Sequence, residues 1–289
     1  MIKVNVGGVP EHFNLAWHLA IESGMFAEMG VQINWVDVPG GTGAMCKQLR
    51  NQELDMAIAL TEGVVSDILQ GNPSKIVQFY VNSPLRWGIF VNAKSDIYEL
   101  SQMQGKKYAI SRFQSGSHLM AFVNAANYRL TIKPEDFAVV GNLNGARAAL
   151  ANNDAQLFLW EKFTTKPYVD NGEFRMIGEC NTPWPCFVVV ASNKFIQEHQ
   201  PLVNNILDVV NLHCSLLKNN IEAPQLIAQR YGIQEQDAAQ WFKELEYASH
   251  HEMSAEQWAT ILNKLVQFNI IGQVPDLEQI CYPANLETV

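Results

Sequence analysis

Residues 105–128 read GKKYAISRFQSGSHLMAFVNAANY, and this stretch decides the fold. Its first part is a short alternating run typical of a strand, and its second half places apolar residues at helical spacing. Ser115, Gly116 and Ser117 form a small-residue turn at the start of that helix. The first N–H groups of a helix lack partners inside it and lie at the positive end of its dipole, so the turn is a candidate anion site. The alternative is that Ser115 or Ser117 only caps the helix.

The composition is that of an ordinary soluble globular protein. The chain has 289 residues, 48% of them hydrophobic and 17% charged, which suits one large domain or two modest ones. A formal net charge of −9 argues against a general nucleic-acid binder, which would show a basic stripe. No run approaches the roughly 18 apolar residues that a membrane span needs.

The start of the chain and its cysteines bear on the cellular compartment. An alternating strand follows Met1 directly, without a basic and apolar leader, so we expect a cytoplasmic protein, or a periplasmic one if a leader has been removed. The five cysteines are an odd number without metal-ligand spacing, which indicates neither a disulfide framework nor a zinc site. Neither glycine loop matches a P-loop or a GxGxxG pattern, so a nucleotide is disfavoured. Since metal-ligand spacing is missing as well, we expect no cofactor and no metal.

Strands alternate with helices along most of the chain. This rhythm predicts an α/β fold in which mostly parallel sheets are joined by right-handed helical crossovers. The predicted strands are residues 2–6, 31–38, 54–60, 75–81, 107–111, 137–141, 156–160 and 173–179.

Two apolar runs divide this pattern into two lobes. We predict that residues 86–92 and 186–192 are the crossings between the lobes and together form a hinge. The first lobe is then residues 1–91 and 188–289, and the second is residues 92–187. The helices expected after the second run are amphipathic and should pack on the first lobe. Two capping boxes are predicted, one of Ser101 with Gln104 and one of Ser254 with Gln257.

The predicted ligand-binding residues follow from the topology. Ligands bind beside the carboxyl ends of strands in open α/β sheets, so the loops after the strands of both lobes should converge on one crevice. In the first lobe these loops supply Pro10, Glu11, His12, Gly41, Thr42, Thr61 and Glu62. In the second they supply Arg112, Phe113, Ser115, Gly116, Ser117, His118, Asn144, Trp160 and Glu161, with Trp184 beside the return crossing.

Acidic and histidine side chains in these loops have two interpretations each. Glu11, Glu62 and Glu161 are candidates to accept hydrogen bonds from an amine, and the alternative is that they are solvated acids at helix starts. His12 and His118 are candidates for polar contacts or acid/base chemistry, although most histidines have neither role.

The remaining candidates are aromatic or glycine residues. Phe113, Trp160 and Trp184 are candidates to stack on a flat ligand, and the alternative is that they are core aromatics. Gly41 allows the backbone to approach a ligand, although such loops also occur for turn geometry alone. The sequence has no GxSxG elbow and no HExxH motif, so no catalytic residue is predicted.

The order of several short motifs resembles a known family. GMFAEMGV at residues 24–31 is similar to the G-x-F-x-x-x-G-[VL] pattern of the solute-binding proteins of nitrate, sulfonate and taurine ABC transporters, grouped with the NMT1/THI5-like thiamine-pyrimidine proteins. Similar motifs continue over about residues 2–195, at residues 39–41, 54–63, 105–110 and 116–118. The resemblance implies a type II periplasmic-binding fold, whose two α/β lobes close on a small molecule by hinge motion. It also implies that the loops named above line the pocket.

Two features depart from that family. WEKF at residues 160–163 stands where many members have Trp-Asp-Pro, and the cysteine cluster of the pyrimidine synthases is missing. The leading hypothesis is therefore a non-catalytic, monomeric binder of an organic anion, such as a sulfonate or carboxylate, or of a pyrimidine-like heterocycle. Its partner would be an ABC transporter permease if the protein is exported. The alternative is a cytoplasmic enzyme on the same fold, chorismate dehydratase-like or thiamine-pyrimidine-related.

Overall fold

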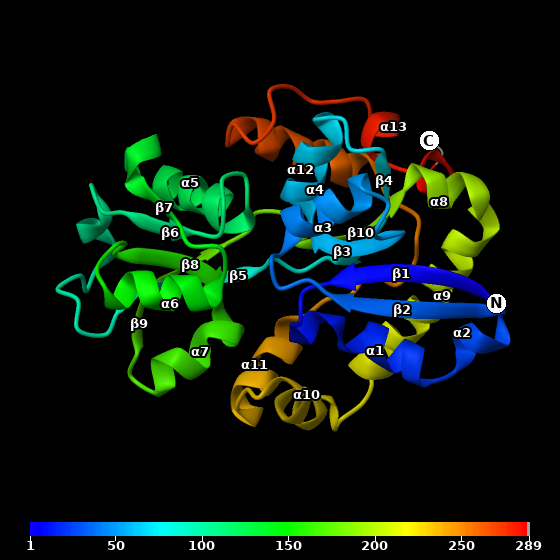
Figure 1. Cartoon of the computed structure of the whole chain (residues 1–289), viewed down its shortest axis with the longest axis horizontal. Coiled ribbons are helices and arrows are strands. Elements are labelled where there is room, and N and C mark those ends of the chain that lie inside the picture. Colours follow the sequence, from blue (N-terminus) through cyan, green and yellow to red (C-terminus); the bar gives the residue numbers. More distant parts are fainter. Residues whose placement is uncertain (288–289) are drawn as a thin grey trace. The chain divides into compact units, whose positions relative to one another are not determined.

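Both sheets of the computed structural model have five strands, and each sheet belongs to a separate compact unit (Figure 1). The structure describes residues 1–287. Unit 1 consists of Met1–Ser83 and Trp184–Val289, and unit 2 of Pro84–Pro183. The predicted α/β class, with two lobes that each contain a mostly parallel sheet, is confirmed.

The sheet of unit 1 has the order β2-β1-β3-β10-β4. β1 (Ile2–Gly8) pairs in parallel with both β2 (Val31–Asp37) and β3 (Met56–Leu60). β10 (Phe187–Ser192) lies antiparallel between β3 and β4 (Ser74–Val81). The carboxyl ends of β1, β2 and β3 therefore lie at one edge of the sheet.

Helices cover both faces of this sheet, with α3 and α4 on one face and α1 and α2 on the other (Figure 1). The helices of unit 1 are α1 (Leu15–Glu22), α2 (Met25–Glu28), α3 (Thr42–Arg50), α4 (Thr61–Leu69), α8 (Asn193–Glu198), α9 (Gln200–Lys218), α10 (Ala223–Tyr231), α11 (Glu235–Glu244), α12 (Ala255–Gln267) and α13 (Leu277–Ile280). Of the capping box predicted at Ser254, one half is confirmed, because Ser254 Oγ accepts the N–H of Gln257 at 3.5 Å. α2, α8 and α13 were not predicted, since helices this short do not repeat an apolar period.

The sheet of unit 2 has the order β7-β6-β8-β5-β9. β6 (Tyr108–Ile110) pairs in parallel with β7 (Phe137–Val139) and β8 (Leu157–Glu161). β5 (Arg86–Asn92) lies antiparallel between β8 and β9 (Phe174–Asn181). α5 (Gly116–Tyr128) covers one face, and α6 (Leu143–Ala151) and α7 (Lys162–Asp170) cover the other (Figure 1).

The two sheets share one topology, and the two runs predicted as crossings between the lobes are strands within these sheets. The apolar run 86–92 is β5, and the run 186–192 is β10 with one residue before it; both are interior strands bonded on both sides rather than connectors. Strands buried on both faces are continuously apolar, which is why the runs lack alternation. The units divide at Ser83 and at Pro183, a few residues before the boundaries that the sequence predicted.

A second correction concerns the first capping box. The 3-10 helix η2 (Leu100–Met103) begins earlier than predicted, with Gln102 Oε1 accepting the N–H of Glu99 at 3.0 Å. The backbone of Glu99 is extended, as a residue before a helical turn must be, so Glu99 and Gln102 replace Ser101 and Gln104 in the box.

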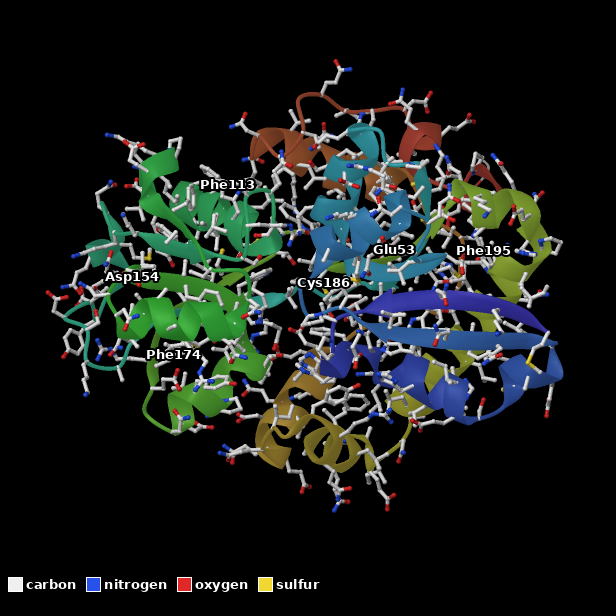
Figure 2. The ribbon with its side chains drawn as sticks, viewed as in Figure 1. Glu53, Phe113, Asp154, Phe174, Cys186 and Phe195 are labelled. Carbon is white, nitrogen blue, oxygen red and sulfur yellow. The ribbon has the colours of Figure 1, made fainter. Side chains whose placement is uncertain are left out.

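Large aromatic residues fill the core of each unit. In unit 2, Phe90, Phe158 and Phe174 pack with small residues of α6; Figure 2 labels Phe174. In unit 1, Trp258 stacks on Phe79 with ring centroids 4.8 Å apart.

All five cysteines are buried. Within residues 1–287 no helix is both long enough and apolar enough to cross a membrane.

Candidate functional site

At the carboxyl edge of unit 1, polar residues from three segments meet. Thr42 Oγ1, at the start of α3, accepts the N–H of Leu60 at 3.0 Å. Thr61 donates its hydroxyl to the carbonyl of Pro185 at 2.6 Å, and Trp184 donates its indole N–H to Glu62 Oε2 at 2.8 Å. The structure thus brings together four predicted residues, Thr42, Thr61, Glu62 and Trp184, all of them buried.

Glu62 is the residue of this group with unusual electrostatics. Its side chain is fully buried, and within the described chain its Oε1 atom has no hydrogen-bond partner. Burial raises the pKa of Glu62 to about 7, although hydrogen bonds from its own backbone and from Trp184 oppose the rise. The carboxyl group therefore changes charge near neutral pH. The interpretation of Glu62 as a solvated helix-start acid is wrong.

The other predicted residues of unit 1 have surroundings that differ from those of Glu62. His12 is 1% exposed, and its ring stacks on Phe13 at 4.9 Å and meets the edge of Trp241 at 4.2 Å. Burial lowers the pKa of His12 to about 3, so the imidazole is neutral at ordinary pH and a poor general base. Pro10 is exposed, and Glu11 is partly exposed.

Gly41 precedes α3 with φ 69° and ψ −164°, a backbone conformation that a side chain strongly disfavours. The glycine is therefore required by the turn that leads into Thr42. Its predicted second role, close approach of a ligand to the backbone, stays a prediction.

In unit 2, the turn between β6 and α5 is built from three buried serines. Ser115 Oγ caps α5 by accepting the N–H of His118 at 3.3 Å, and Ser117 Oγ accepts the N–H of Ser111 at 3.0 Å. The hydroxyl of Ser117 also contacts those of Ser115, at 3.0 Å, and Ser111, at 3.4 Å. The interpretation of Ser115 as a helix cap is confirmed.

Capping does not use all the donors of this turn. The hydroxyls of Ser111, Ser115 and Ser117 carry three protons but make only two contacts with one another, so one O–H group remains to donate elsewhere. The N–H groups of Gly116 and Ser117 lie in the first turn of α5, where a helix offers no internal acceptor. The turn therefore retains three donors at the positive end of a helix dipole.

His118 is bound to the same turn through its ring. Its Nδ1 accepts the N–H of Gln114 at 3.0 Å. Its ring lies among Phe113, Phe122 and Phe137, with centroids 5.3, 5.0 and 4.6 Å away. Burial lowers the pKa of His118. Arg112, at the start of the turn, is partly exposed.

Glu161 ends β8 and is as deeply buried as Glu62. Its Oε2 accepts the N–H of Thr164 at 2.6 Å, which caps α7. Burial raises the pKa of Glu161 to about 7 against the hydrogen bonds from α7. The solvated alternative is therefore wrong for Glu161 as well.

Two other predicted residues of unit 2 have mainly structural contacts. Trp160 is partly buried, and its ring stacks on Phe158 at 5.3 Å against the core. Asn144 is exposed on α6, where its Oδ1 accepts a hydrogen bond from Arg147 at 3.2 Å. Neither residue contacts the serine turn through a hydrogen bond.

Sequence reasoning missed a charged cluster at the carboxyl edge of this sheet. Arg86 Nη2 lies 2.7 Å from Glu179 Oε2, and Lys162 Nζ lies 2.6 Å from Glu179 Oε1. Burial alone would raise the pKa of Glu179, but hydrogen bonds and charge from Lys162 and Arg86 lower it. Two cations thus share one carboxylate. The only indication in the sequence is Lys162, which belongs to the WEKF segment that differs from the family's Trp-Asp-Pro. Its partners Arg86 and Glu179 lie outside that segment, so spacing does not reveal them.

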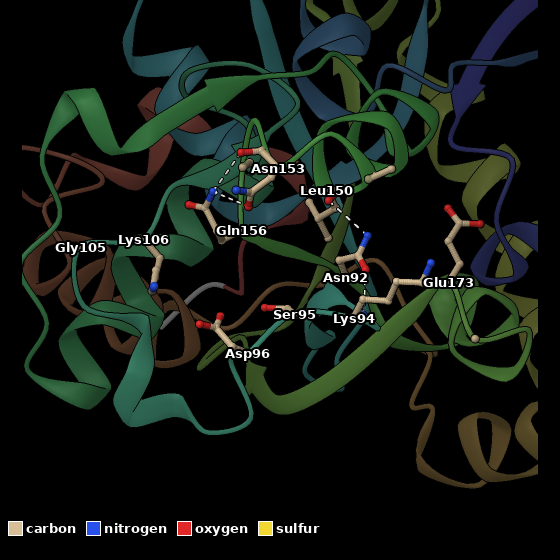
Figure 3. Close-up of a pocket in the computed structure, with 13 residues that line it drawn as sticks. Asn92, Lys94, Ser95, Asp96, Gly105, Lys106, Leu150, Asn153, Gln156 and Glu173 are labelled. Atoms are coloured by element: carbon tan, nitrogen blue, oxygen red, sulfur yellow. Dashed lines mark hydrogen bonds between the residues drawn. The ribbon is translucent and has the colours of Figure 1, made fainter.

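A groove of about 950 Å³ lies at the opposite edge of the second sheet, before β6, β8 and β9 (Figure 3). Its amide side chains are bound to neighbouring loops: Gln156 donates to Asn153 Oδ1 at 3.0 Å, and Asn92 donates to the carbonyl of Leu150 at 3.3 Å. None of the predicted site residues lines this groove.

Across residues 1–287, no three His, Cys, Asp or Glu side chains form a group that could hold a metal.

Comparison with known proteins agrees with this architecture. The family model described as Ca3427-like PBP matches residues 87–180, which is most of unit 2. No curated protein matched the sequence. The structure of the Candida albicans CA3427 gene product is similar, with a TM-score of 0.87 and 27% identity over 99% of this chain and 96% of that chain. It is described as defining a new family with the generic periplasmic binding protein fold.

Two bacterial proteins are similar at lower identity. The alkanesulfonate-binding protein SsuA of Xanthomonas axonopodis pv. citri, bound to MOPS, has a TM-score of 0.78 and 17% identity, covering 99% of this chain and 98% of that chain. The aliphatic sulphonate-binding protein SsuA of Escherichia coli has a TM-score of 0.72 and 14% identity, covering 99% of each. The chain therefore has the periplasmic binding protein fold, as the resemblance of its motifs implied.

Proposed function

We propose that this chain is a non-catalytic binding protein for a small organic anion, with a sulfonate as the preferred headgroup and a carboxylate as the next choice. The observation that carries the proposal is the buried serine turn at the head of α5, which keeps three hydrogen-bond donors after the helix has been capped. Similarity to two sulfonate-binding proteins supports the choice of ligand class.

The donors match the chemistry of a sulfonate. A sulfonate has three equivalent oxygen acceptors and stays ionised at any physiological pH. The turn offers two N–H groups, from Gly116 and Ser117, and one serine O–H. Hydrogen bonds to a charged acceptor are about twice as strong as neutral ones, and the dipole of the 13-residue helix α5 adds to them.

A panel of ligands tests the proposal. Taurine, methanesulfonate, MOPS, small carboxylates and pyrimidines are each added while the melting temperature is followed. A ligand present at about 100 times its Kd should stabilise the protein by roughly 2.7 kcal/mol. The expected result is stabilisation by at least one sulfonate. If none of the anions raises the melting temperature, the proposal is refuted.

A matched pair of variants at Gly116 identifies the site. Gly116 is the first residue of α5, where proline is well tolerated, and the extended backbone of Ser115 suits a following proline. Gly116→Pro removes one N–H donor, whereas Gly116→Ala adds a side chain and keeps the donor. We expect sulfonate to bind Gly116→Pro roughly tenfold more weakly than Gly116→Ala. Equal affinities would place the anion elsewhere.

An enzyme on the same fold is the second candidate. It is favoured by the two buried carboxyls, Glu62 and Glu161, whose pKa values of about 7 suit general acid/base chemistry. The variants Glu62→Gln and Glu161→Gln separate the two functions. Loss of product formation with ligand binding intact would establish an enzyme, and absence of turnover in the wild type would favour the binding protein.

A further inference from the structure

The turn that carries the proposed anion site is bound to one residue. His118 is attached to it twice, by its backbone N–H, which donates to Ser115 Oγ at 3.3 Å, and by its ring, whose Nδ1 accepts the N–H of Gln114 at 3.0 Å. Because Nδ1 is an acceptor, the neutral ring carries its proton on Nε2.

The segment held by the ring is strained. Gln114 has φ 63°, in the left-handed region that residues other than glycine and asparagine disfavour. A residue in this conformation persists only where its surroundings fix it. The N–H of Ser115 donates to the carbonyl of Arg112 at 3.2 Å, so the turn closes directly over Gln114. The hydrogen bond to His118 is therefore a natural restraint on the turn.

The ring itself is fixed by aromatic packing. Phe113 belongs to the turn, Phe122 lies one helical turn further along α5, and Phe137 opens β7. The ring is half-buried, and its pKa is lowered by burial without a contribution from a neighbouring charge. The charged residues beside these contacts are Arg112 in the turn and Asp136 before Phe137; within residues 1–287 no ion pair reaches His118.

We propose that His118 is a positioning residue, whose neutral imidazole holds Gln114 and thereby sets the donor geometry of Ser115, Gly116 and Ser117. Protonation converts Nδ1 from an acceptor into a donor, so the imidazolium cannot accept the N–H of Gln114. The turn is then released as the pH falls, and the anion site loses its arranged donors. This inference rests on the proposed function for its effect on binding, but not for its effect on the turn.

Hydrogen exchange of the Gln114 amide tests the hold on the turn without any ligand. His118→Asn places an amide oxygen near the position of Nδ1 and does not titrate, whereas His118→Phe keeps an aromatic ring and removes the acceptor. Because burial lowers the pKa of His118, the wild type should keep its protection at Gln114 near neutral pH and lose it, relative to the intrinsic exchange rate, as the pH falls towards about 4. His118→Asn should keep its protection across that range, and His118→Phe should lack it throughout.

The control is His250→Asn, which removes an exposed histidine in unit 1 and should leave Gln114 unchanged. If the Gln114 amide exchanges equally in His118→Phe and the wild type, the proposal is overturned whatever the protein binds.

Binding of methanesulfonate tests the consequence. We expect its affinity to fall roughly tenfold in His118→Phe and to become independent of pH between 5 and 7.5 in His118→Asn. Stronger binding by the wild type at pH 5 would mean that the imidazolium attracts the anion directly, and it would overturn the positioning role. If no sulfonate binds the wild type at any pH, the proposed function fails, while hydrogen exchange alone still decides whether His118 holds the turn.

Discussion

Replacing Glu62 by glutamine should stabilise the protein at alkaline pH and have little effect at acidic pH. The carboxyl group is fully buried, has one hydrogen bond from Trp184, and has no ion-pair partner within the described chain. Folding therefore favours the protonated form. Glutamine has nearly the same shape, keeps an oxygen that accepts the indole N–H, and cannot ionise.

The size of the effect follows from the pKa. The pKa of Glu62 rises from 4.5 to about 7 on folding, because burial penalises the charged form. A group whose pKa is raised in the folded state contributes stability that is fully present below its unfolded pKa and is lost as the pH rises through the folded value. At about 1.36 kcal/mol per pKa unit, the ionised carboxylate costs roughly 3 kcal/mol at pH 8 and less than about 1 kcal/mol at pH 5.

Melting temperatures of the wild type and Glu62→Gln at pH 5, 6, 7 and 8 measure this difference. For a unit of this size, a gain of roughly 2.5 kcal/mol between pH 5 and pH 8 corresponds to about 6 °C. Glu28→Gln makes the same chemical change at an exposed site of unit 1 and should show no such trend. A constant difference between wild type and Glu62→Gln at all four pH values would refute the argument that Glu62 is an uncompensated buried acid.

Two further predictions concern unit 2. Gly145→Ala should destabilise the protein by roughly 1–3 kcal/mol, because a Cβ there would lie 1.8 Å from the carbonyl oxygen of Val140. The midpoint of urea unfolding measures this loss. Gly178→Ala is the control and should lower the midpoint less, because its Cβ meets only the flexible end of Leu100 at 2.7 Å. Glu179→Gln should also cost roughly 1–3 kcal/mol, since it removes the carboxylate that Arg86 and Lys162 share. Glu173→Gln, which affects only the more exposed Arg147, is the control, and an equal loss of stability would contradict the argument.

The sequence predicted the fold better than the chain's path between the units. Alternation of strands and helices is a local pattern, so eight of the ten strands were placed within a few residues. The role of β5 and β10 was not predictable from that pattern, because an apolar run buried on both faces has no period that identifies it as a strand. Only the pairing of Val189 with Ile58 and Gln78 on its two sides reveals an interior position.

The candidate site shows a similar limit. The carboxyl-end rule selected Glu11, Glu62 and Glu161 together, but it could not separate the partly exposed Glu11 from the two buried acids. Burial of Glu62 depends on Trp184, which lies 122 residues further along the chain. The cluster of Arg86 with Glu179 spans 93 residues and was missed for the same reason. Spacing within a loop carries no information about such partners.

Glu62 and Glu161 lie at the same strand-to-helix junction in two sheets of the same topology, although Glu161 is the N-cap of α7 and Glu62 is the second residue of α4. Each lies where the third parallel strand, β3 or β8, passes into its following helix. Each is buried with a pKa raised to about 7, yet their hydrogen-bond donors differ, an indole in one unit and a backbone amide in the other. Burying a carboxyl costs free energy even where a cation lies nearby, as Arg86 does for Glu161, so packing alone does not account for a buried acid at this edge of both sheets. Because such costs concentrate at functional positions, these two acids are the residues whose replacement best tests for chemistry beyond anion binding.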